Sequence, residues 1–376
     1  MKSNRYQVAI IGGGLGGLTL AVQLADSGYS CILFEKNSYP FHRVCGEYIS
    51  MESWNFLERL GIELSTQNLP KIHHLKVSSP SGKILESALE LGGFGVSRYL
   101  LDDQLQQLAK QKGVCIVEGC KVHAVDFTGE AFMIQSSKGA YHADIAVGAW
   151  GKQSNMDGGR KLPGTFNKKK KNYVGIKYHV KLNFPADQIE LHNFKDGYCG
   201  ISRVEGDTCC MCYLTGAQTL KKYNGNIRQM EMEILMQNPR LKKYFSEAAF
   251  LFEEPLAISQ IRIGYKGAVD NNLLMLGDAA GNIAPLSGNG MSMAMRSSAH
   301  LFVLLDGFLK GKMTRADLNK SYEKFWKQQF KSRIQISGVL QRLLKNKRLT
   351  DVTIGVLNRL PALKRAVVRS THGEVF

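Results

Sequence analysis

A glycine-rich turn between two short apolar runs constrains the fold more than any other feature of the chain. The apolar runs cover residues 8–11 and 31–34, and small and apolar residues recur at helical spacing between them. The glycines of the turn follow the spacing G-x-G-x-x-G, at Gly12, Gly14 and Gly17. This order predicts a strand, a tight turn, a helix and a second strand.

The pattern is typical of a dinucleotide-binding site. The first glycine permits the tight turn, the second lets the backbone approach a pyrophosphate, and the third packs the helix against the strand. The N-terminus of the helix then presents free N–H groups to the phosphates. At the end of the second strand, Glu35 is placed to accept hydrogen bonds from a ribose. The turn by itself fits FAD and NAD equally.

Length and composition indicate a globular protein with two cores. The chain has 376 residues, of which 44% are hydrophobic. Its eight cysteines show no paired spacing, and the group at residues 209–212 lacks a second pair of metal ligands, so we expect reduced structural thiols and no metal. We find no signal peptide and no apolar run of the ~20 residues that span a membrane. We therefore expect a cytoplasmic protein.

The net charge of +17 indicates an anionic partner or surface. Basic residues gather in the lysine run at residues 168–171 and in the C-terminal region. Because no basic–aromatic binding motif accompanies them, we do not expect nucleic acid. An anionic membrane, with the protein peripheral to it, or an acidic carrier protein fits the charge better. A solvated basic face without a partner is the simpler alternative.

Two further motifs stand far from the glycine-rich turn. One is the pattern S-R-x-x-L-D, which contains Arg98 at the start of a predicted helix. The other follows a buried strand at residues 273–276 and combines Asp278 with a second glycine-rich turn at residues 288–291. The segment after that turn is small and apolar on all sides, which predicts a buried helix.

With these three motifs the chain resembles the FAD-dependent oxidoreductases of the p-hydroxybenzoate hydroxylase fold, especially the geranylgeranyl reductase and electron-transfer oxidoreductase branch. The resemblance covers residues 5–330 and implies FAD as the cofactor, since no second dinucleotide fingerprint is present. In the family, the arginine contacts the flavin cofactor and the aspartate bonds the ribityl chain. The second turn starts a helix whose N–H groups stabilise negative charge on the reduced flavin. The expected cofactor-binding residues are Gly12, Gly14, Leu15, Gly17, Glu35, Lys36, Arg43, Arg98, Val122, Asp278, Gly288, Asn289, Gly290 and Met291.

The predicted fold class is α/β. We expect a Rossmann-like FAD-binding domain of the glutathione-reductase type, with an inserted substrate domain built on an antiparallel sheet, because residues 173–214 alternate with period two. A basic helical region ends the chain. The expected boundaries are 1–71, 97–165 and 266–315 for the FAD-binding domain, 72–96 and 166–265 for the substrate domain, and 316–376 for the C-terminal region.

Four residues are candidates for positions beside the flavin. By family position, Arg43 is expected to contact the pyrophosphate or the ring. Cys45 either lines the substrate side of the ring or is a small buried hydrophobe. Glu47 is interpreted as a cap of the following helix. Tyr198 matches a tyrosine of the geranylgeranyl reductases, and it either donates a proton or packs. Cys45 and Tyr198 are thus the catalytic candidates.

Two departures from the family pattern bear on the reaction. Trp150 stands where the monooxygenases have an aspartate, and the tryptophan and Phe-Pro pair that follow the reductases' tyrosine are absent after Tyr198. We expect an FAD-dependent oxidoreductase that reduces a double bond of, or hydroxylates, an apolar lipid, isoprenoid or polyketide-like substrate, with NAD(P)H as a candidate electron donor. The alternatives are an aromatic monooxygenase or halogenase-like enzyme, although the halogenase W-x-W signature is missing, and an electron-transfer flavoprotein with a protein partner.

The C-terminal region is amphipathic and basic. Leu318, Tyr322, Trp326 and Phe330 share one helical face, and apolar residues at helical spacing continue through residues 336–368 among lysines and arginines. One interpretation is that the apolar stripe packs on the flavin domain while the cations are solvated. The other is that part of the surface rests on an anionic membrane and gives access to an apolar substrate.

Overall fold

A computed structural model describes residues 5–152, 154–158, 160, 172–343, 347–369 and 373–376. The predicted lysine run at residues 168–171 and part of the C-terminal stripe, at Leu344, lie outside the described residues. No helix in the described ranges is long and apolar enough to cross a membrane.

The first sheet contains the predicted strand–turn–helix–strand unit. Its strands follow the order β17-β18-β9-β1-β2-β6, and β1 pairs in parallel with both β2 and β9. An antiparallel pair, β7 and β8, joins the sheet through β9. The strands are β1 (Arg5–Ile11), β2 (Cys31–Phe34), β6 (Cys115–Val117), β7 (Val122–Phe127), β8 (Phe132–Ser136), β9 (Gly139–Gly148), β17 (Val269–Asp270) and β18 (Leu273–Met275).

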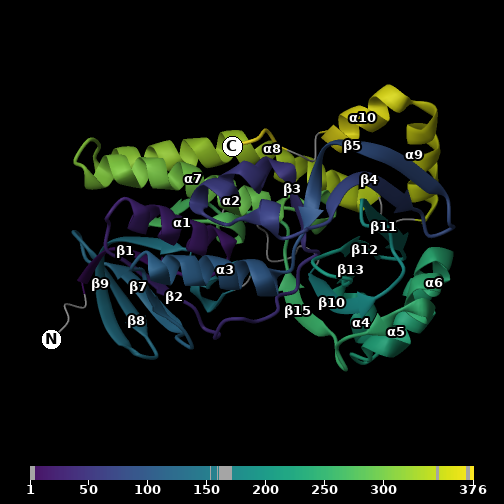
Figure 1. The fold of residues 1–376 in the computed structure, drawn as a ribbon, viewed down its shortest axis with the longest axis horizontal. Coiled ribbons are helices and arrows are strands. Elements are labelled where there is room, and N and C mark those ends of the chain that lie inside the picture. The colour runs from purple at the N-terminus through teal and green to yellow at the C-terminus, as the bar shows by residue number, and fades with distance from the viewer. Residues whose placement is uncertain (1–4, 153, 159, 161–171, 344–346, 370–372) are drawn as a thin grey trace.

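Three helices pack together beside this sheet and bury its apolar strands. The helix α1 (Leu15–Asp26) contacts both α3 (Arg98–Gln111) and α7 (Gly290–Leu309), and α2 (Trp54–Leu60) lies nearby (Figure 1). The predicted buried helix after the second glycine-rich turn is therefore confirmed as α7. Ser97 caps α3 by accepting a hydrogen bond from the N–H of Leu100, so the S-R-x-x-L-D pattern starts a helix, as predicted.

The second sheet is mainly antiparallel, as residues 173–214 predicted. Its order is β14-β10-β13-β12-β11-β4-β5-β3, with β15 also paired to β10 and with β4 and β11 parallel to each other. The strands are β3 (Tyr48–Ser50), β4 (Lys71–Ser78), β5 (Ile84–Gly95), β10 (Tyr173–Lys181), β11 (Gln188–Phe194), β12 (Gly197–Arg203), β13 (Cys209–Gly216), β14 (Ala249–Phe250) and β15 (Leu256–Ile261). A small pair, β16 (Gly264–Tyr265) and β19 (Gly281–Asn282), stands apart.

The two faces of the second sheet differ in their surroundings. Alternate residues of β10, β12 and β13 form a separate core with the helices α4 (Ala217–Lys222), α5 (Ile227–Glu233) and α6 (Pro239–Glu247). The opposite face of these strands carries Lys177, His179, Cys210 and Tyr198. The loop between β2 and β3 approaches that face, since the thiol of Cys210 donates a hydrogen bond to the carbonyl of Cys45 at 3.2 Å. The sheet thus meets the FAD-binding domain through its polar face.

The C-terminal region forms three helices with different partners. Five residues of α8 (Arg315–Leu343) are buried in the core of the first domain, namely Leu318, Tyr322, Trp326, Phe330 and Ile334. The predicted packing on the flavin domain is therefore confirmed for this part of the stripe, whereas Ile336 and Leu343 are exposed. In contrast, α9 (Lys347–Arg359) and α10 (Pro361–Arg369) contact β5 of the second sheet, and they form the upper right of Figure 1.

Candidate functional site: a candidate flavin-binding site

The glycines of the first turn have three different surroundings. A Cβ atom added at Gly12, where φ is +116°, would overlap the carbonyl of Ala149, and one added at Gly17 would overlap the carbonyl of Gly12. A Cβ atom at Gly14 would meet only Nη2 of Arg98, at 3.6 Å. Gly12 and Gly17 are therefore required by the fold, because any side chain there collides with the backbone. The space above Gly14 is open, at the N-terminus of α1 where Leu15 begins the helix.

Glu35 lies at the end of β2 beside this turn. Its buried carboxylate accepts hydrogen bonds from the backbone N–H groups of Gly13, at 3.0 Å, and Asn37, at 3.1 Å. Arg43 contacts the same carboxylate at 3.1 Å and also donates to the carbonyl of Gly13 at 2.9 Å. Lys36, which we predicted to bind the cofactor, is exposed. Arg43 thus lies at the glycine-rich turn, where a pyrophosphate contact was expected.

The second motif lies directly beside the first. Arg98 is buried and forms two hydrogen bonds of 2.7 Å with the carboxylate of Asp102, which also accepts one from Arg43. Burial opposes the charge of Arg98, but Asp102 outweighs this effect, so the pKa of Arg98 is raised. The guanidinium therefore stays charged, within reach of the open space above Gly14.

The third motif supplies a carboxylate and a helix start. Asp278 follows β18 and is half-buried, and burial raises its pKa despite the nearby cations Lys152, Lys266 and Arg98. Gly288 has φ of +62° and ends the turn before α7. Asn289 is buried and donates to Glu52 at 2.5 Å, while its side-chain oxygen has no hydrogen-bond partner among the residues that the structure describes. Gly290 begins α7.

The two catalytic candidates have different neighbours. The sulfur of Cys45 is 3.5 Å from that of Met291, in the first turn of α7. Tyr198 is buried on β12 in a cluster with Leu214 and Ile261, and burial raises the pKa of its phenol well above the ordinary value. Val122, in contrast, begins β7 and is buried in the core of the first sheet. The structure therefore brings Cys45 to the α7 turn, and it gives Tyr198 an apolar setting.

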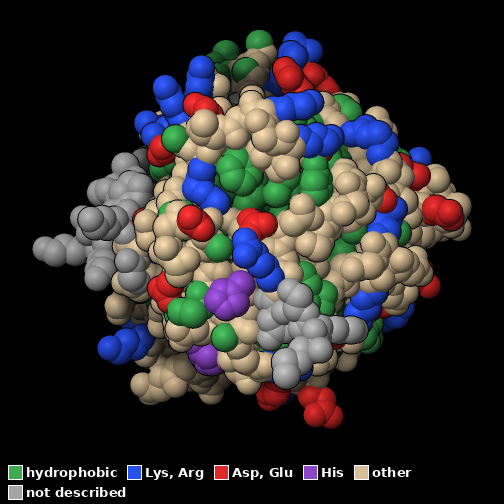
Figure 2. Space-filling model, turned by 90° about the vertical axis from the view of Figure 1, so that its left-hand side faces the viewer, with side chains coloured by type: hydrophobic (Ala, Val, Ile, Leu, Met, Phe, Trp, Pro, Cys, Tyr) green, Lys and Arg blue, Asp and Glu red, His purple; other side chains and the backbone are tan. Residues whose placement is uncertain are grey.

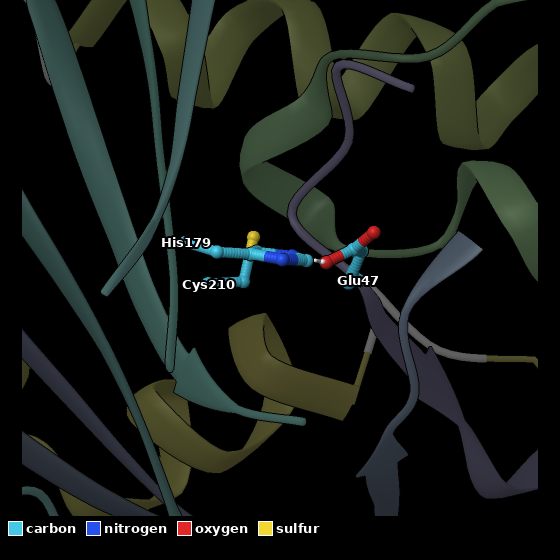
Figure 3. A group of neighbouring side chains, drawn as sticks. All are labelled: Glu47, His179 and Cys210. Carbon is cyan, nitrogen blue, oxygen red and sulfur yellow. Dashed lines mark hydrogen bonds and ion pairs between the residues drawn. The ribbon is translucent and has the colours of Figure 1, made fainter. Parts of the chain in front are cut away.

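Glu47 joins the two domains, a role that its sequence position did not indicate (Figure 3). Its buried carboxylate contacts the ammonium of Lys177 at 2.5 Å and Nε2 of His179 at 2.6 Å. It also accepts a hydrogen bond of 2.8 Å from the N–H of Arg98, the first residue of α3. The predicted cap of the following helix is therefore wrong, because Ser50 occupies that position and Glu47 contacts a helix 51 residues further along.

Electrostatics explain why this carboxylate is charged in spite of its burial. Burial alone would raise the pKa of Glu47, but the bonds from His179 and Lys177 outweigh it and hold the pKa below the usual range. Burial opposes the charge of Lys177, but Cys210 and Glu47 outweigh this effect, so the pKa of Lys177 is raised. Ligand atoms of Glu47, His179 and Cys210 lie within 4.8 Å of one another. Because Lys177 already neutralises Glu47, the group is explained as an ion-pair cluster and needs no metal.

The site fits FAD in three respects. It offers open space at a helix N-terminus for the pyrophosphate and a buried acid at the end of β2 for the ribose. It also offers a carboxylate after β18, at Asp278, and the unpaired oxygen of Asn289 at the start of α7. Gly12, Gly14, Glu35, Arg98 and Asp278 would thus hold the adenine dinucleotide and the ribityl chain. The bound flavin would supply hydride or oxygen chemistry that no side chain provides.

Comparisons with known proteins agree with this fit. Residues 5–195, half of the chain, match the family described as FAD binding domain. Conditioned medium factor receptor 1 of Dictyostelium discoideum is 26% identical over 369 residues, with 90% of this chain and 71% of that protein covered. Digeranylgeranylglycerophospholipid reductase of Methanococcus aeolicus is 23% identical over 344 residues, covering 88% and 84%. A geranylgeranyl bacteriochlorophyll reductase-like structure from Thermoplasma acidophilum superposes with a TM-score of 0.79 at 17% identity, covering 99% and 96%.

The chain belongs to the FAD-binding domain family. It is an FAD-dependent oxidoreductase with FAD as its cofactor. The predicted α/β fold class and the predicted resemblance are both confirmed. The individual site residues remain predictions.

Several residues of the site were missed in the sequence. Lys177, His179 and Cys210 lie on β10 and β13, and Tyr39 donates a hydrogen bond of 2.5 Å to the carbonyl of Gly13. An available signal was the charged pair Lys177 and His179 on an otherwise apolar alternating strand, because buried charges require partners. Nothing in the local pattern identified Glu47 as that partner.

Substituting Asp278 with alanine is expected to weaken FAD binding by about 1.5–3 kcal/mol, the usual contribution of a hydrogen bond to a charged group. The dissociation constant for FAD should therefore rise roughly tenfold to somewhat above a hundredfold. Titrating the apoprotein with FAD and following flavin fluorescence measures it. The matched control is Asp126→Ala, an exposed carboxylate on β7. Equal affinities for the two variants would show that Asp278 does not face the ribityl chain.

Proposed function

We propose that the substrate is an apolar lipid, isoprenoid or polyketide-like molecule that enters a cavity between the second sheet and the C-terminal helices. The cavity has a volume of about 130 Å³. Its sheet wall consists of aliphatic side chains, and Ile354, Leu357 and Val367 of α9 and α10 close it. An enclosure with so few polar groups suits an apolar ligand.

The position of the cavity is the observation that carries this proposal. Leu286 and Gly288, from the turn before α7, line its inner end together with Tyr48. By the family resemblance, that turn faces the flavin ring. A substrate chain in the cavity would therefore end beside the reactive part of the cofactor. The similarity to a digeranylgeranylglycerophospholipid reductase supports the same class of substrate.

We propose reduction of a carbon–carbon double bond as the reaction, with hydroxylation of the same class of substrate as the alternative. NAD(P)H is the proposed electron donor. Tyr198 belongs to an apolar cluster that includes Leu191 and Leu286, both of which line the cavity. We propose that its phenol, which is protonated at neutral pH, supplies the proton that reduction of the double bond requires beside the hydride. Cys45, beside Met291, would limit the flavin face on which the substrate approaches.

Anaerobic reduction of the holoprotein tests the proposal. If an isoprenoid alkene such as geranylgeraniol reoxidises the reduced protein without oxygen, the reaction is reduction. If reoxidation with product formation requires oxygen, it is hydroxylation. If geranylgeraniol is not modified with or without oxygen, and only a redox protein accepts the electrons, the protein is an electron-transfer flavoprotein and the proposal fails. Repeating the first step with NADH and NADPH identifies the electron donor.

A larger side chain inside the cavity is expected to weaken substrate binding and to leave the flavin bound. Val77 lines the cavity from β4, and tryptophan at this position would occupy much of its volume. We expect Val77→Trp to bind geranylgeraniol about tenfold more weakly or worse, equivalent to at least ~1.4 kcal/mol, by calorimetric titration. Leu251→Trp, on an exposed side chain, is the control. Equal binding by both variants would place the substrate elsewhere.

A further inference from the structure

Exposed apolar side chains are concentrated in the C-terminal helices. Within the described residues, fourteen large hydrophobic side chains are exposed, and nine of them lie between residues 336 and 375. Those nine are Ile336, Val339, Leu343, Leu349, Val352, Val356, Leu360, Leu363 and Val375. Scattered exposed hydrophobics need no explanation, but a concentration on one element marks an interaction surface.

The helix α9 shows how these side chains are arranged. Thr350 and Ile354 are buried, and Leu357 lines the cavity, so this face of the helix packs on the second sheet. Leu349, Val352 and Val356 are exposed and recur three and four residues apart, which places them in one stripe. The apolar band of α9 is therefore wider than its contact with the protein, and the part formed by Leu349, Val352 and Val356 faces solvent.

The charges beside this band are almost all positive. Residues 347–369 contain six lysines and arginines but one acidic residue, Asp351, whose carboxylate accepts a hydrogen bond from Ser81. Arg359, Arg365 and Arg369 are exposed. By contrast, Figure 2 shows the end of the molecule formed by the first sheet, where acidic and basic side chains are interspersed.

We propose that α9 and α10 dock on an anionic lipid bilayer, with the stripe of Leu349, Val352 and Val356 inserted among the lipid headgroups. An exposed apolar stripe bordered by arginines is the pattern of helices that lie in a membrane interface. The arginines supply attraction to anionic lipid, which falls off within a Debye length. An acidic protein partner would satisfy the charges but would leave the inserted stripe unexplained.

The same two helices close the cavity, so docking would bring it next to the bilayer. This access route rests on the proposed apolar substrate, whereas the docking itself does not. The cavity has a volume of about 130 Å³ in the described form, and a shift of α9 and α10 away from the second sheet would enlarge it. A bilayer that binds the outer face of these helices can favour such a shift, because it stabilises whichever arrangement exposes more of the stripe.

Co-sedimentation of the holoprotein with lipid vesicles tests the docking. We expect binding to vesicles of phosphatidylcholine mixed with phosphatidylglycerol at low salt, and about tenfold weaker binding to phosphatidylcholine alone or at high salt. Equal binding under all conditions, or none, would overturn the proposal. If salt-sensitive binding occurs only with an acidic carrier protein, the surface is a protein interface and the proposal is also overturned.

Matched variants separate docking from general effects of charge. Val352 and Val303 are exposed to a similar extent, 63% and 61%, but Val303 lies on α7. We expect Val352→Glu to lose vesicle binding about tenfold or more and Val303→Glu to bind as the natural protein does. Arg365→Glu and Lys320→Glu form a second such pair, since both cations are exposed and only Arg365 lies on α10. Equal loss within either pair would contradict the proposal.

The vesicle assay needs no substrate, so the two proposals can fail separately. Val352 does not line the cavity, and Val352→Glu should therefore bind geranylgeraniol in detergent solution like the natural protein. Loss of vesicle binding with normal geranylgeraniol binding supports docking. Normal vesicle binding in Val352→Glu overturns docking even when the cavity binds its ligand.

Discussion

Substituting Gly14 with valine is expected to yield a folded protein that retains almost no FAD. A Cβ atom at this position meets no backbone, and its nearest neighbour is Nη2 of Arg98 at 3.6 Å, so the backbone of the turn tolerates a side chain at Gly14. It would, however, occupy the path along which a pyrophosphate approaches the N-terminus of α1. The ratio of flavin to protein absorbance after desalting measures the loss, and circular dichroism confirms the fold.

Two substitutions in the same helix serve as controls. A Cβ atom at Gly16 makes ordinary contacts of 3.5 Å or more, so Gly16→Ala should keep its FAD. At Gly17 a Cβ atom overlaps the carbonyl of Gly12, and Gly17→Ala should therefore lower the stability of the protein as well as its flavin content. Full FAD retention in Gly14→Val would refute the assignment of the pyrophosphate site.

Substituting Glu47 with glutamine is expected to cause the largest loss of stability of any single carboxylate change. Lys177 has no exposed surface, and the substitution would leave its ammonium buried without an anion. Removing one partner of a buried ion pair costs about 3–5 kcal/mol. Urea unfolding at neutral pH measures the loss. Glu118→Gln, which breaks a partly exposed ion pair with Lys110, should cost about 1 kcal/mol or less.

The contribution of the Glu47–Lys177 ion pair to the free energy of unfolding depends on pH. Since folding lowers the pKa of Glu47, its contribution is present above the ordinary glutamate value, roughly 4.3, and is lost as the pH falls through the folded value. Since folding raises the pKa of Lys177, the contribution of that residue disappears only at strongly alkaline pH. The natural protein should therefore lose stability on acidification more steeply than Glu47→Gln does.

A double variant distinguishes the ion pair from a packing effect. Glu47→Gln combined with Lys177→Met removes both charges, and it should be more stable than Glu47→Gln alone. If the double variant is no more stable, the loss comes from the altered backbone contact with Arg98, and the ion-pair explanation is wrong. Equal losses of unfolding free energy in Glu47→Gln and Glu118→Gln would also show that the ion-pair explanation is wrong.

The dinucleotide-binding unit could be predicted from the sequence because its constraints are local. Gly12, Gly17 and Glu35 lie within a single strand–turn–helix–strand segment, and each is required by backbone conformation or close packing inside that segment. Spacing alone therefore identifies them. The helix that starts at Gly290 was predictable for the same reason, since a segment apolar on all sides must be buried.

The ion-pair cluster could not be predicted because its members are far apart in the chain. Glu47 lies 130 residues from Lys177 and 132 from His179. Which carboxylate neutralises these two cations depends on the register of β10 and on how the loop of Cys45 docks against it. Sequence alone left Glu47 as a cap of the nearest helix, because a local partner is the default when no distant contact is known.

For the C-terminal region, too, the sequence determined some properties and the tertiary structure determined others. Its sequence by itself determined that it is helical, amphipathic and basic, because the 3.6-residue period of apolar side chains is a local property. That period is the same whether the helix packs on the flavin domain, covers the second sheet or rests on a membrane. Only the tertiary structure decided that one face of α8 is buried in the first core, while α9 and α10 line an apolar cavity and leave the stripe of Leu349, Val352 and Val356 exposed.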